Sequence, residues 1–194
     1  MEYRLAPEHP FPAPLDDVVT AYRALLAEGI PADRIVLGGE SAGGGLVLAA
    51  MVALREAGEP LPAAAAVFSP WVDLTLAGES VSGKAAVDPI LSIESLQPAS
   101  LWYVGEWDAA DPRVSPVFAD LSALPPLSVQ VGSREVLLDD AVRLAARAAA
   151  SDVRVTLDVI PGAIHGFEAH EAEEVASDGY LAAAGEFLSA NLAG

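Results

Sequence analysis

A serine lies between glycines in the stretch GESAG at residues 39–43, directly after a short apolar run. A serine hydroxyl is a poor nucleophile unless its geometry and a neighbouring base activate it. On a sharp strand-to-helix turn, the pattern G-x-S-x-G raises the hydroxyl above a sheet, and the small neighbours let a substrate approach. The backbone N–H of Ala42 would then face a developing oxyanion at a helix N-terminus. We therefore expect Ser41 to be the nucleophile of an acyl-transfer reaction, with an incidental turn serine as the alternative.

Three histidines are candidates for the general base that such a serine needs. His9 lies in a proline-rich loop, and His170 lies beside an acidic residue where we expect a helix to begin. His165 follows an apolar run in the glycine-flanked loop PGAIHGF. Active sites of open parallel sheets lie at the C-terminal ends of the strands. This position selects His165 as the base.

A carboxylate after the preceding strand should orient the imidazole and stabilise its charged form. Glu135 is the first acidic residue beyond the strand expected at 127–131, where a short loop can reach His165. Asp139 and Asp140 come later, in the following helix, where we expect them to cap and solvate the helix start. We therefore favour Glu135 as the acid and keep Asp139 as the alternative.

Strands and helices must alternate to bring these residues to one edge of a sheet. From apolar periodicity, helices are expected at residues 15–26, 42–57, 96–104, 138–150 and 180–192, and strands at 35–37, 63–68, 127–131 and 153–160. This alternation predicts an α/β fold whose mostly parallel sheet is covered by helices on both faces. No linker or repeat interrupts the chain, so we expect one domain over residues 1–194. The tryptophans Trp71, Trp102 and Trp107 are expected to pack in the core or on the surface rather than to line a substrate site.

The composition restricts the partners and the setting. The net charge is −18 and the sequence contains no cysteine. Nucleic acid and anionic membranes are therefore disfavoured as partners, and disulfides and thiolate metal sites are excluded. The longest strongly apolar run, at residues 46–54, is too short to span a bilayer, and MEYRLAPEHP lacks the features of a signal peptide. We expect a cytoplasmic protein without membrane insertion.

Six segments together resemble the bacterial hormone-sensitive-lipase-like esterases, the family IV carboxylesterases of the α/β-hydrolase superfamily. In the order of that family they are YRLAPEHPFPAPLDDV, GESAGGG, SPWVDLT, SPVFADLSALPP, GSREVLLDDA and PGAIHGF. The resemblance implies that small acyl esters are hydrolysed through an acyl-enzyme, without a metal or an organic cofactor. The chain order Ser41, Glu135, His165 also agrees with this family.

The sequence departs from the family pattern at three places. Glu40 and Glu135 stand where members commonly have aspartate. Members also carry an H-G-G-G motif before the YRLAPE segment, which supplies most of the oxyanion hole, and no HGG occurs in this sequence. The resemblance thus implies that the N-terminal cap and the first strands are missing, with Tyr3–Leu5 as the end of the fourth strand. With Ala42 as the one identifiable oxyanion donor, we expect weak esterase activity. The alternative is a non-catalytic remnant that acts as a scaffold or binding module.

An unpaired strand edge should result from these missing strands. In the family, strand three lies beside the strand that corresponds to residues 35–37, so its absence would expose backbone N–H and C=O groups in mid-sheet. Three coverings are considered, namely self-association into a homo-oligomer, strand exchange, and movement of Tyr3–Leu5 to a place beside residues 35–37.

Overall fold

An α/β architecture is present in the computed structural model, which describes residues 1–167 and 177–192. One parallel sheet has the strand order β1-β2-β3-β4. Its strands are β1 (Val36–Glu40), β2 (Ala64–Phe68), β3 (Leu127–Gly132) and β4 (Val155–Ile160). The α-helices are α1 (Ala13–Ala27), α2 (Ala42–Glu56), α3 (Glu79–Gly83), α4 (Ile93–Val104), α5 (Leu138–Ala150) and α6 (Ser177–Asn191). The predicted fold class and the parallel sheet are confirmed.

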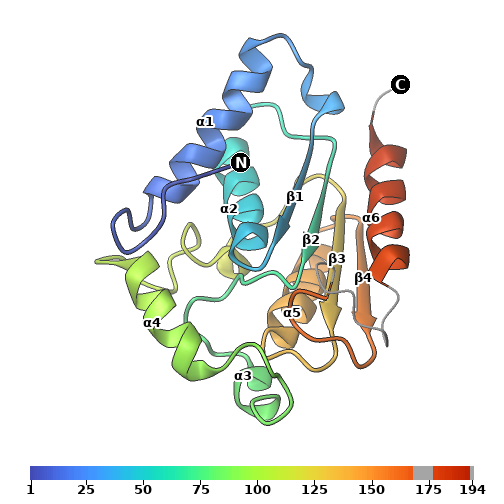
Figure 1. The fold of residues 1–194 in the computed structure, drawn as a ribbon. Coiled ribbons are helices and arrows are strands. Elements are labelled where there is room, and N and C mark those ends of the chain that lie inside the picture. Colours follow the sequence, from blue (N-terminus) through green and yellow to red (C-terminus); the bar gives the residue numbers. More distant parts are fainter. Residues whose placement is uncertain (168–176, 193–194) are drawn as a thin grey trace.

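Helices cover both faces of the sheet (Figure 1). Side chains alternate between the faces along each strand, and Val67 and Val129 pack with Leu48 of α2 and Leu144 of α5 in the largest core cluster. Helix α1 packs on the outer side of α2. On the opposite face, α6 lies against β2 and β3.

The two strands that precede the serine and the acid differ in their surroundings. Strand β3 is buried along its whole length, whereas β1 is only partly buried and, within the described residues, pairs with β2 alone. The carbonyl of Ile35 and the N–H of Ser41 both bond to β2. Because alternate residues of a strand address opposite neighbours, the residues whose backbone groups face the open edge are Val36, Gly38 and Glu40. Strand β1 is therefore a bare edge, as the sequence predicts.

Several boundaries differ from the prediction. Strand β1 continues through Gly38-Gly39-Glu40, so that Ser41 follows the strand directly. Strand β4 begins at Val155 rather than at residue 153, and the short helix α3 has no counterpart in the prediction. Helix α4 begins at Ile93 rather than at residue 96, because Ser92 and Ser95 form a reciprocal capping box at its start.

The prediction that Tyr3–Leu5 forms the end of a strand is wrong, since these residues are not in a strand. They also do not move beside β1 to cover its edge. The backbone N–H of Arg4 instead donates to Asp17 Oδ2 at 2.8 Å, and its guanidinium group binds the same carboxylate. This pairing with α1 holds the N-terminal segment in an irregular conformation.

Candidate active site

Ser41 occupies a sharp turn between the end of β1 and the start of α2. Its backbone φ is 54°, a left-handed value that is uncommon for residues other than glycine. Two hydrogen bonds fix this turn, because the Ser41 N–H donates to the Phe68 carbonyl and the Trp71 N–H donates to the Ser41 carbonyl, both at 2.9 Å. The turn has the strained conformation expected of a nucleophile elbow.

Glycines let the backbone segments of this elbow approach one another closely. A Cβ atom at Gly39 would lie 2.4 Å from the carbonyl oxygen of Gly43, and one at Gly45 would lie 2.2 Å from that of Trp71. At Gly43 itself a Cβ atom would meet no atom within 4 Å. The first glycine of the motif is therefore required by contact distance, whereas the last one is not.

Glu135 lies at the C-terminal end of β3 and is fully buried. Its Oε1 accepts hydrogen bonds from the Gly132 N–H at 2.5 Å and from the Ser69 hydroxyl at 2.7 Å. Its Oε2 lies 3.0 Å from His165 Nδ1. Both carboxylate oxygens are therefore held in place, and the acid favoured from the sequence is brought to the histidine favoured as the base. Ser69 was not singled out in the sequence, although its position at the end of β2, beside β3, was an available signal.

His165 is buried in the loop after β4. Its Nε2 lies 3.2 Å from Glu40 Oε1, and within the described residues no hydrogen bond joins it to Ser41. Burial lowers the pKa of His165, but hydrogen bonds to Glu135 and Glu40, with the charges of both carboxylates, raise it further, to about 9. A raised pKa favours the cationic form of the ring, in which both nitrogens can donate to the two carboxylates. The other candidates stand apart, since His9 lies in an exposed N-terminal turn and His170 lies outside the described residues.

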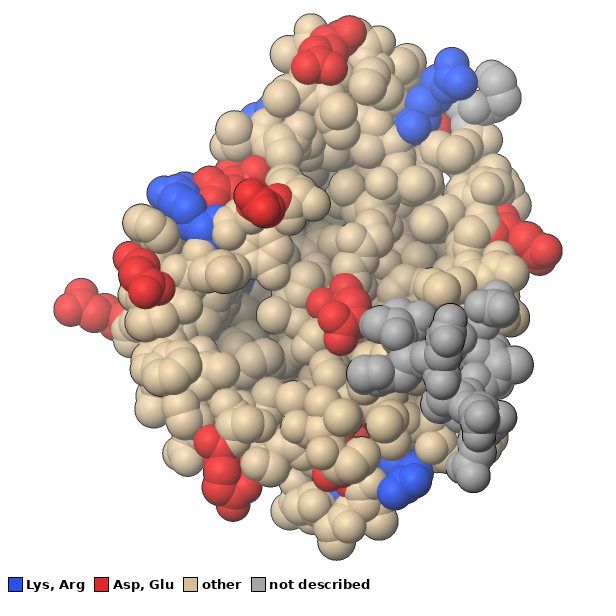
Figure 2. All heavy atoms as spheres, viewed as in Figure 1, with Lys and Arg blue, Asp and Glu red and all other residues tan. Residues whose placement is uncertain are grey.

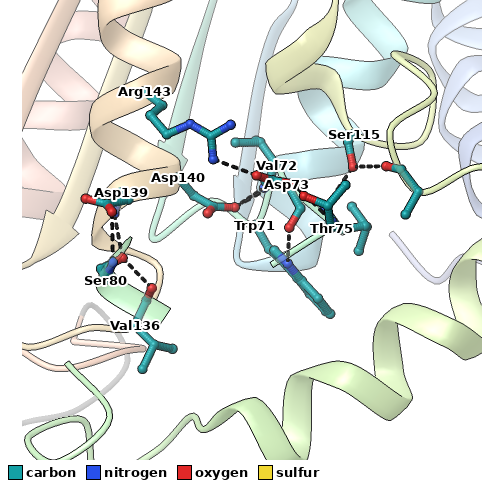
Figure 3. A network of polar contacts seen from close by, with 12 residues as sticks. Trp71, Val72, Asp73, Thr75, Ser80, Ser115, Val136, Asp139, Asp140 and Arg143 are labelled. Carbon is teal, nitrogen blue, oxygen red and sulfur yellow. Dashed lines mark hydrogen bonds and ion pairs between the residues drawn. The ribbon is translucent and has the colours of Figure 1, made fainter. Parts of the chain in front are cut away.

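The prediction that Asp139 and Asp140 cap and solvate the start of α5 is wrong, because both carboxylates bind other segments (Figure 3). Asp139 Oδ2 accepts a hydrogen bond from the Ser80 N–H at 2.8 Å. Asp140 is buried, and its Oδ2 accepts hydrogen bonds from the N–H groups of Val72 and Asp73, each at 2.9 Å. The alternative acid, Asp139, thus points to α3 and not to the histidine.

The segment at residues 69–75 is fastened to α5 by buried polar contacts (Figure 3). Asp73 Oδ2 binds Arg143 Nη1 at 2.5 Å, and the indole N–H of Trp71 donates to the Asp73 carbonyl at 3.1 Å. Burial raises the pKa of Asp140 to about 7, while its backbone hydrogen bonds lower it, the Asp73 charge raises it and Arg143 lowers it. These contacts fix the position of Trp71 beside the elbow.

An apolar pocket of about 230 Å³ opens beside the elbow. Figure 2 shows this face hollowed between α1 and α4, with acidic side chains scattered singly around it. The lining residues come from the N-terminal segment, α2, the 69–75 segment and α4, and include Tyr3, Ala42, Trp71, Leu74, Trp102 and Tyr103. Trp71 and Trp102 line this pocket, and Trp71 also packs in a hydrophobic core cluster, as expected. Trp107 instead lies against Arg113, whose guanidinium carbon is 4.6 Å from the ring centre.

A backbone donor faces this pocket at the start of α2. Ala42 is the first residue of the helix, so its N–H has no acceptor within the helix. The positive end of the helix dipole favours negative charge at this position. The site thus combines a partly exposed elbow, a buried acid–histidine pair, a backbone donor and an apolar pocket. Over the described residues, no helix is long and apolar enough to cross a membrane.

Comparisons with known proteins agree with this arrangement. The sequence profile of the alpha/beta hydrolase fold family matches residues 1–169. An acetyl-hydrolase of Streptomyces hygroscopicus is 46% identical over 165 residues, which are 85% of this chain and 55% of that protein. An esterase of Acinetobacter venetianus is 41% identical, over 89% of this chain and 57% of its own length. The chain thus spans little more than half the length of these curated relatives.

A crystal structure of an esterase from the bacterial hormone-sensitive lipase family superposes with a TM-score of 0.95 at 48% identity. The match covers 99% of this chain and 65% of that one. A hormone-sensitive-lipase homologue from a metagenome library superposes with a TM-score of 0.95 at 45% identity. The chain therefore belongs to the α/β-hydrolase fold family, and the solved structures that it resembles are esterases of the bacterial hormone-sensitive lipase family.

Proposed function

We propose that this chain carries the catalytic residues of a serine carboxylesterase that hydrolyses short-chain acyl esters through an acyl-enzyme. Ser41 is the nucleophile, His165 the general base and Glu135 the acid. The observation that carries the proposal is the 3.0 Å contact of His165 with the buried Glu135. Like the elbow, both residues lie beyond the C-terminal ends of the strands. The esterase and acetyl-hydrolase names of the relatives support it.

In this mechanism, neutral His165 takes the Ser41 proton on Nε2 while Ser41 Oγ attacks the ester carbonyl. The oxyanion that forms is stabilised by the Ala42 N–H. Collapse of the intermediate breaks the bond to the alcohol, which leaves with the proton that His165 returns. Water then attacks the acyl-enzyme by the same route, so that the acid is released and Ser41 regains its proton. Glu135 remains ionised throughout and stabilises the imidazolium.

The apolar pocket supports an ester with a small hydrocarbon chain as the substrate. It begins at Ala42, next to the nucleophile, and Trp71 and Leu74 form part of its wall. Burial of apolar groups stabilises a bound chain by about 0.8 kcal/mol per methylene group. We therefore place the acyl chain in this pocket.

We expect a low rate, because Ala42 is the one oxyanion donor identified among the residues that the structure describes. Removing a single donor from an oxyanion hole costs about 2.7–4 kcal/mol, or a factor of about 10²–10³ in kcat. A chain that lacks the family's H-G-G-G donors should lose at least this much.

A second candidate function is a non-catalytic scaffold or binding module of the same fold. One observation favours it, since Nε2 of His165 faces Glu40 and forms no hydrogen bond with Ser41 among the described residues. The family membership applies equally to this alternative.

We propose further that a second copy of the chain covers the open edge of β1. The backbone groups of Val36, Gly38 and Glu40 face this edge, and edge strands of this kind pair readily with other strands. Sedimentation velocity over a range of concentrations should show a dimer. Gly38→Lys should weaken this dimer, because a lysine on an edge strand disfavours pairing with another strand. The variant should still fold, because a Cβ atom at this position would meet only ordinary contacts. A compact monomer at every concentration would exclude this association.

Placement in the cytoplasm stays a prediction from the sequence.

The catalytic proposal is tested by hydrolysis of p-nitrophenyl acetate and butyrate. We expect slow hydrolysis by the chain and background rates for Ser41→Ala. Ser122→Ala, an exposed loop serine far along the chain from the elbow, is the matched control and should keep the full rate. Equal rates for the chain and Ser41→Ala would reject the esterase proposal and favour the scaffold.

A further inference from the structure

The histidine of this site faces a second carboxylate where the mechanism needs it to face the serine. Glu40 Oε1 lies 3.2 Å from His165 Nε2, while Glu135 Oε2 lies 3.0 Å from Nδ1. The two carboxylates differ in their surroundings, because the Glu135 side chain is fully buried and that of Glu40 is 44% exposed. The imidazole thus lies between the buried carboxylate of Glu135 and the partly exposed carboxylate of Glu40.

The contacts with Glu40 and Glu135 can form at the same time only when both ring nitrogens carry a proton, that is, when the imidazole is a cation. An ionised carboxylate accepts hydrogen bonds and donates none. In neutral His165, the proton on Nδ1 is directed to Glu135, which leaves Nε2 as an acceptor. Two acceptors repel each other, so deprotonation of the ring removes the attraction between Nε2 and the Glu40 carboxylate.

Other charged groups do not replace Glu40 in this role. Among the residues that the structure describes, the charged groups that act on His165 are Glu135 and Glu40. Tyr3 is the further titratable group beside Glu40, which raises the pKa of that phenol, after burial as the larger cause. Tyr3 is neutral in the range in which the histidine titrates.

We propose that Glu40 is a positioning residue that holds the cationic His165 away from Ser41 and releases it when the ring loses its proton. This inference rests on the proposed esterase function and adds a control of its base. Release is inexpensive, because Glu40 lies at the end of an edge strand and its side chain is 44% exposed, so that water can replace the imidazole as its partner. Nε2 is then free to accept the Ser41 proton.

Two consequences follow for this chain. Its reactivity at neutral pH should be limited by the small neutral fraction of His165, since burial lowers the pKa of that ring but both carboxylates raise it to about 9. Neutralising Glu40 should then increase reactivity near pH 7, which is the opposite of what removal of a supporting residue would do.

The test uses Glu40→Gln in the full chain, with Glu106→Gln as the matched control, because Glu106 is exposed and makes none of the side-chain contacts described above. NMR titration gives the pKa of the His165 ring, with its signals assigned through His9→Gln and His170→Gln variants. The rate of Ser41 labelling by a fluorophosphonate probe is measured from pH 6 to pH 10. We expect Glu40→Gln to lower the His165 pKa by about one unit and to raise the labelling rate at pH 7 about tenfold. Glu106→Gln should change neither.

Three outcomes decide the matter. An unchanged His165 pKa in Glu40→Gln overturns the proposal, as does a lowered pKa with an unchanged pH profile of labelling. A lowered pKa in a chain that no probe labels at any pH supports the hold of Glu40 on His165 and rejects the esterase function. Should Glu40→Gln fail to fold, Glu40→Asp serves in its place, because its carboxylate ends one methylene earlier and should also lower the pKa.

Discussion

The acid–histidine half of the site and the serine half are built by different means. Glu135 is held by hydrogen bonds from Ser69 and Gly132, in a position that two neighbouring strands enclose. The serine lies at the end of β1, which has one neighbour, and its turn is shaped by the close approach of glycine backbones. One half depends on satisfied buried polar groups, and the other depends on the absence of side chains.

This difference shows where the site is rigid and where it can respond. A buried carboxylate with filled hydrogen bonds has few alternatives, because every other position leaves a polar group unpaired. A partly exposed carboxylate on an edge strand can exchange its partner for water at little cost. His165 contacts both carboxylates, and of the two contacts the one with Glu40 is the more easily exchanged for water.

The largest expected effect comes from breaking the buried half. Glu135→Ala leaves His165, Ser69 and Gly132 without their shared acceptor, and we expect a loss of about 3–5 kcal/mol in the free energy of unfolding. Denaturant titration measures this loss. Glu40→Ala, which removes the exposed carboxylate from the same histidine, should cost only about 1–1.5 kcal/mol at pH 7, the equivalent of about one pKa unit. Similar losses in the two variants would contradict the contrast drawn between the halves.

A smaller change in the free energy of unfolding is expected when the pH is varied. The ordinary pKa of a histidine is 6.5, and that of His165 in the folded chain is about 9. Because the folded state binds this proton more tightly, the contribution of His165 to stability is complete below pH 6.5 and is lost as the pH rises through 9. We expect a decrease of about 2–3 kcal/mol over this window, after allowance for partial screening.

Denaturation at a series of pH values checks this decrease. In His165→Asn, the free energy of unfolding should change much less between pH 6.5 and pH 9. The pKa of Asp140 is raised from 3.8 to about 7, so its contribution to stability is lost as the pH rises between these two values, which is mainly below this window. A wild-type stability that stays level from pH 6.5 to pH 9 would argue against the cationic pair with Glu40.

The smallest effect concerns the glycine-packed half. Gly45→Ala would bring a methyl group to 2.2 Å from the Trp71 carbonyl oxygen, and we expect a loss of about 1–3 kcal/mol from the strain. Gly43→Ala, two residues earlier in the same helix, meets open space and should be neutral or slightly stabilising. Thermal unfolding of both variants makes the comparison. Equal changes in the two variants would contradict the role of close backbone approach in this half of the site.

The sequence by itself determined the fold class, the approximate elements and which residues could do chemistry. Apolar periodicity is local, so the strands before Ser41, Glu135 and His165 could be read from short windows. The serine motif, a histidine after the last strand and an acid after the strand before it were sufficient to select three residues that share one edge of the sheet.

Only the tertiary structure decided which polar groups meet. The sequence predicts that Asp139 and Asp140 belong to the start of a helix, yet they bind Ser80 of α3 and Val72, which lie 59 and 68 residues away in the chain. The contact of Glu40 with His165 likewise joins the last residue of β1 to a residue in the loop after β4. Such contacts depend on side-chain reach and burial across the assembled sheet, and no local pattern of residues encodes either quantity.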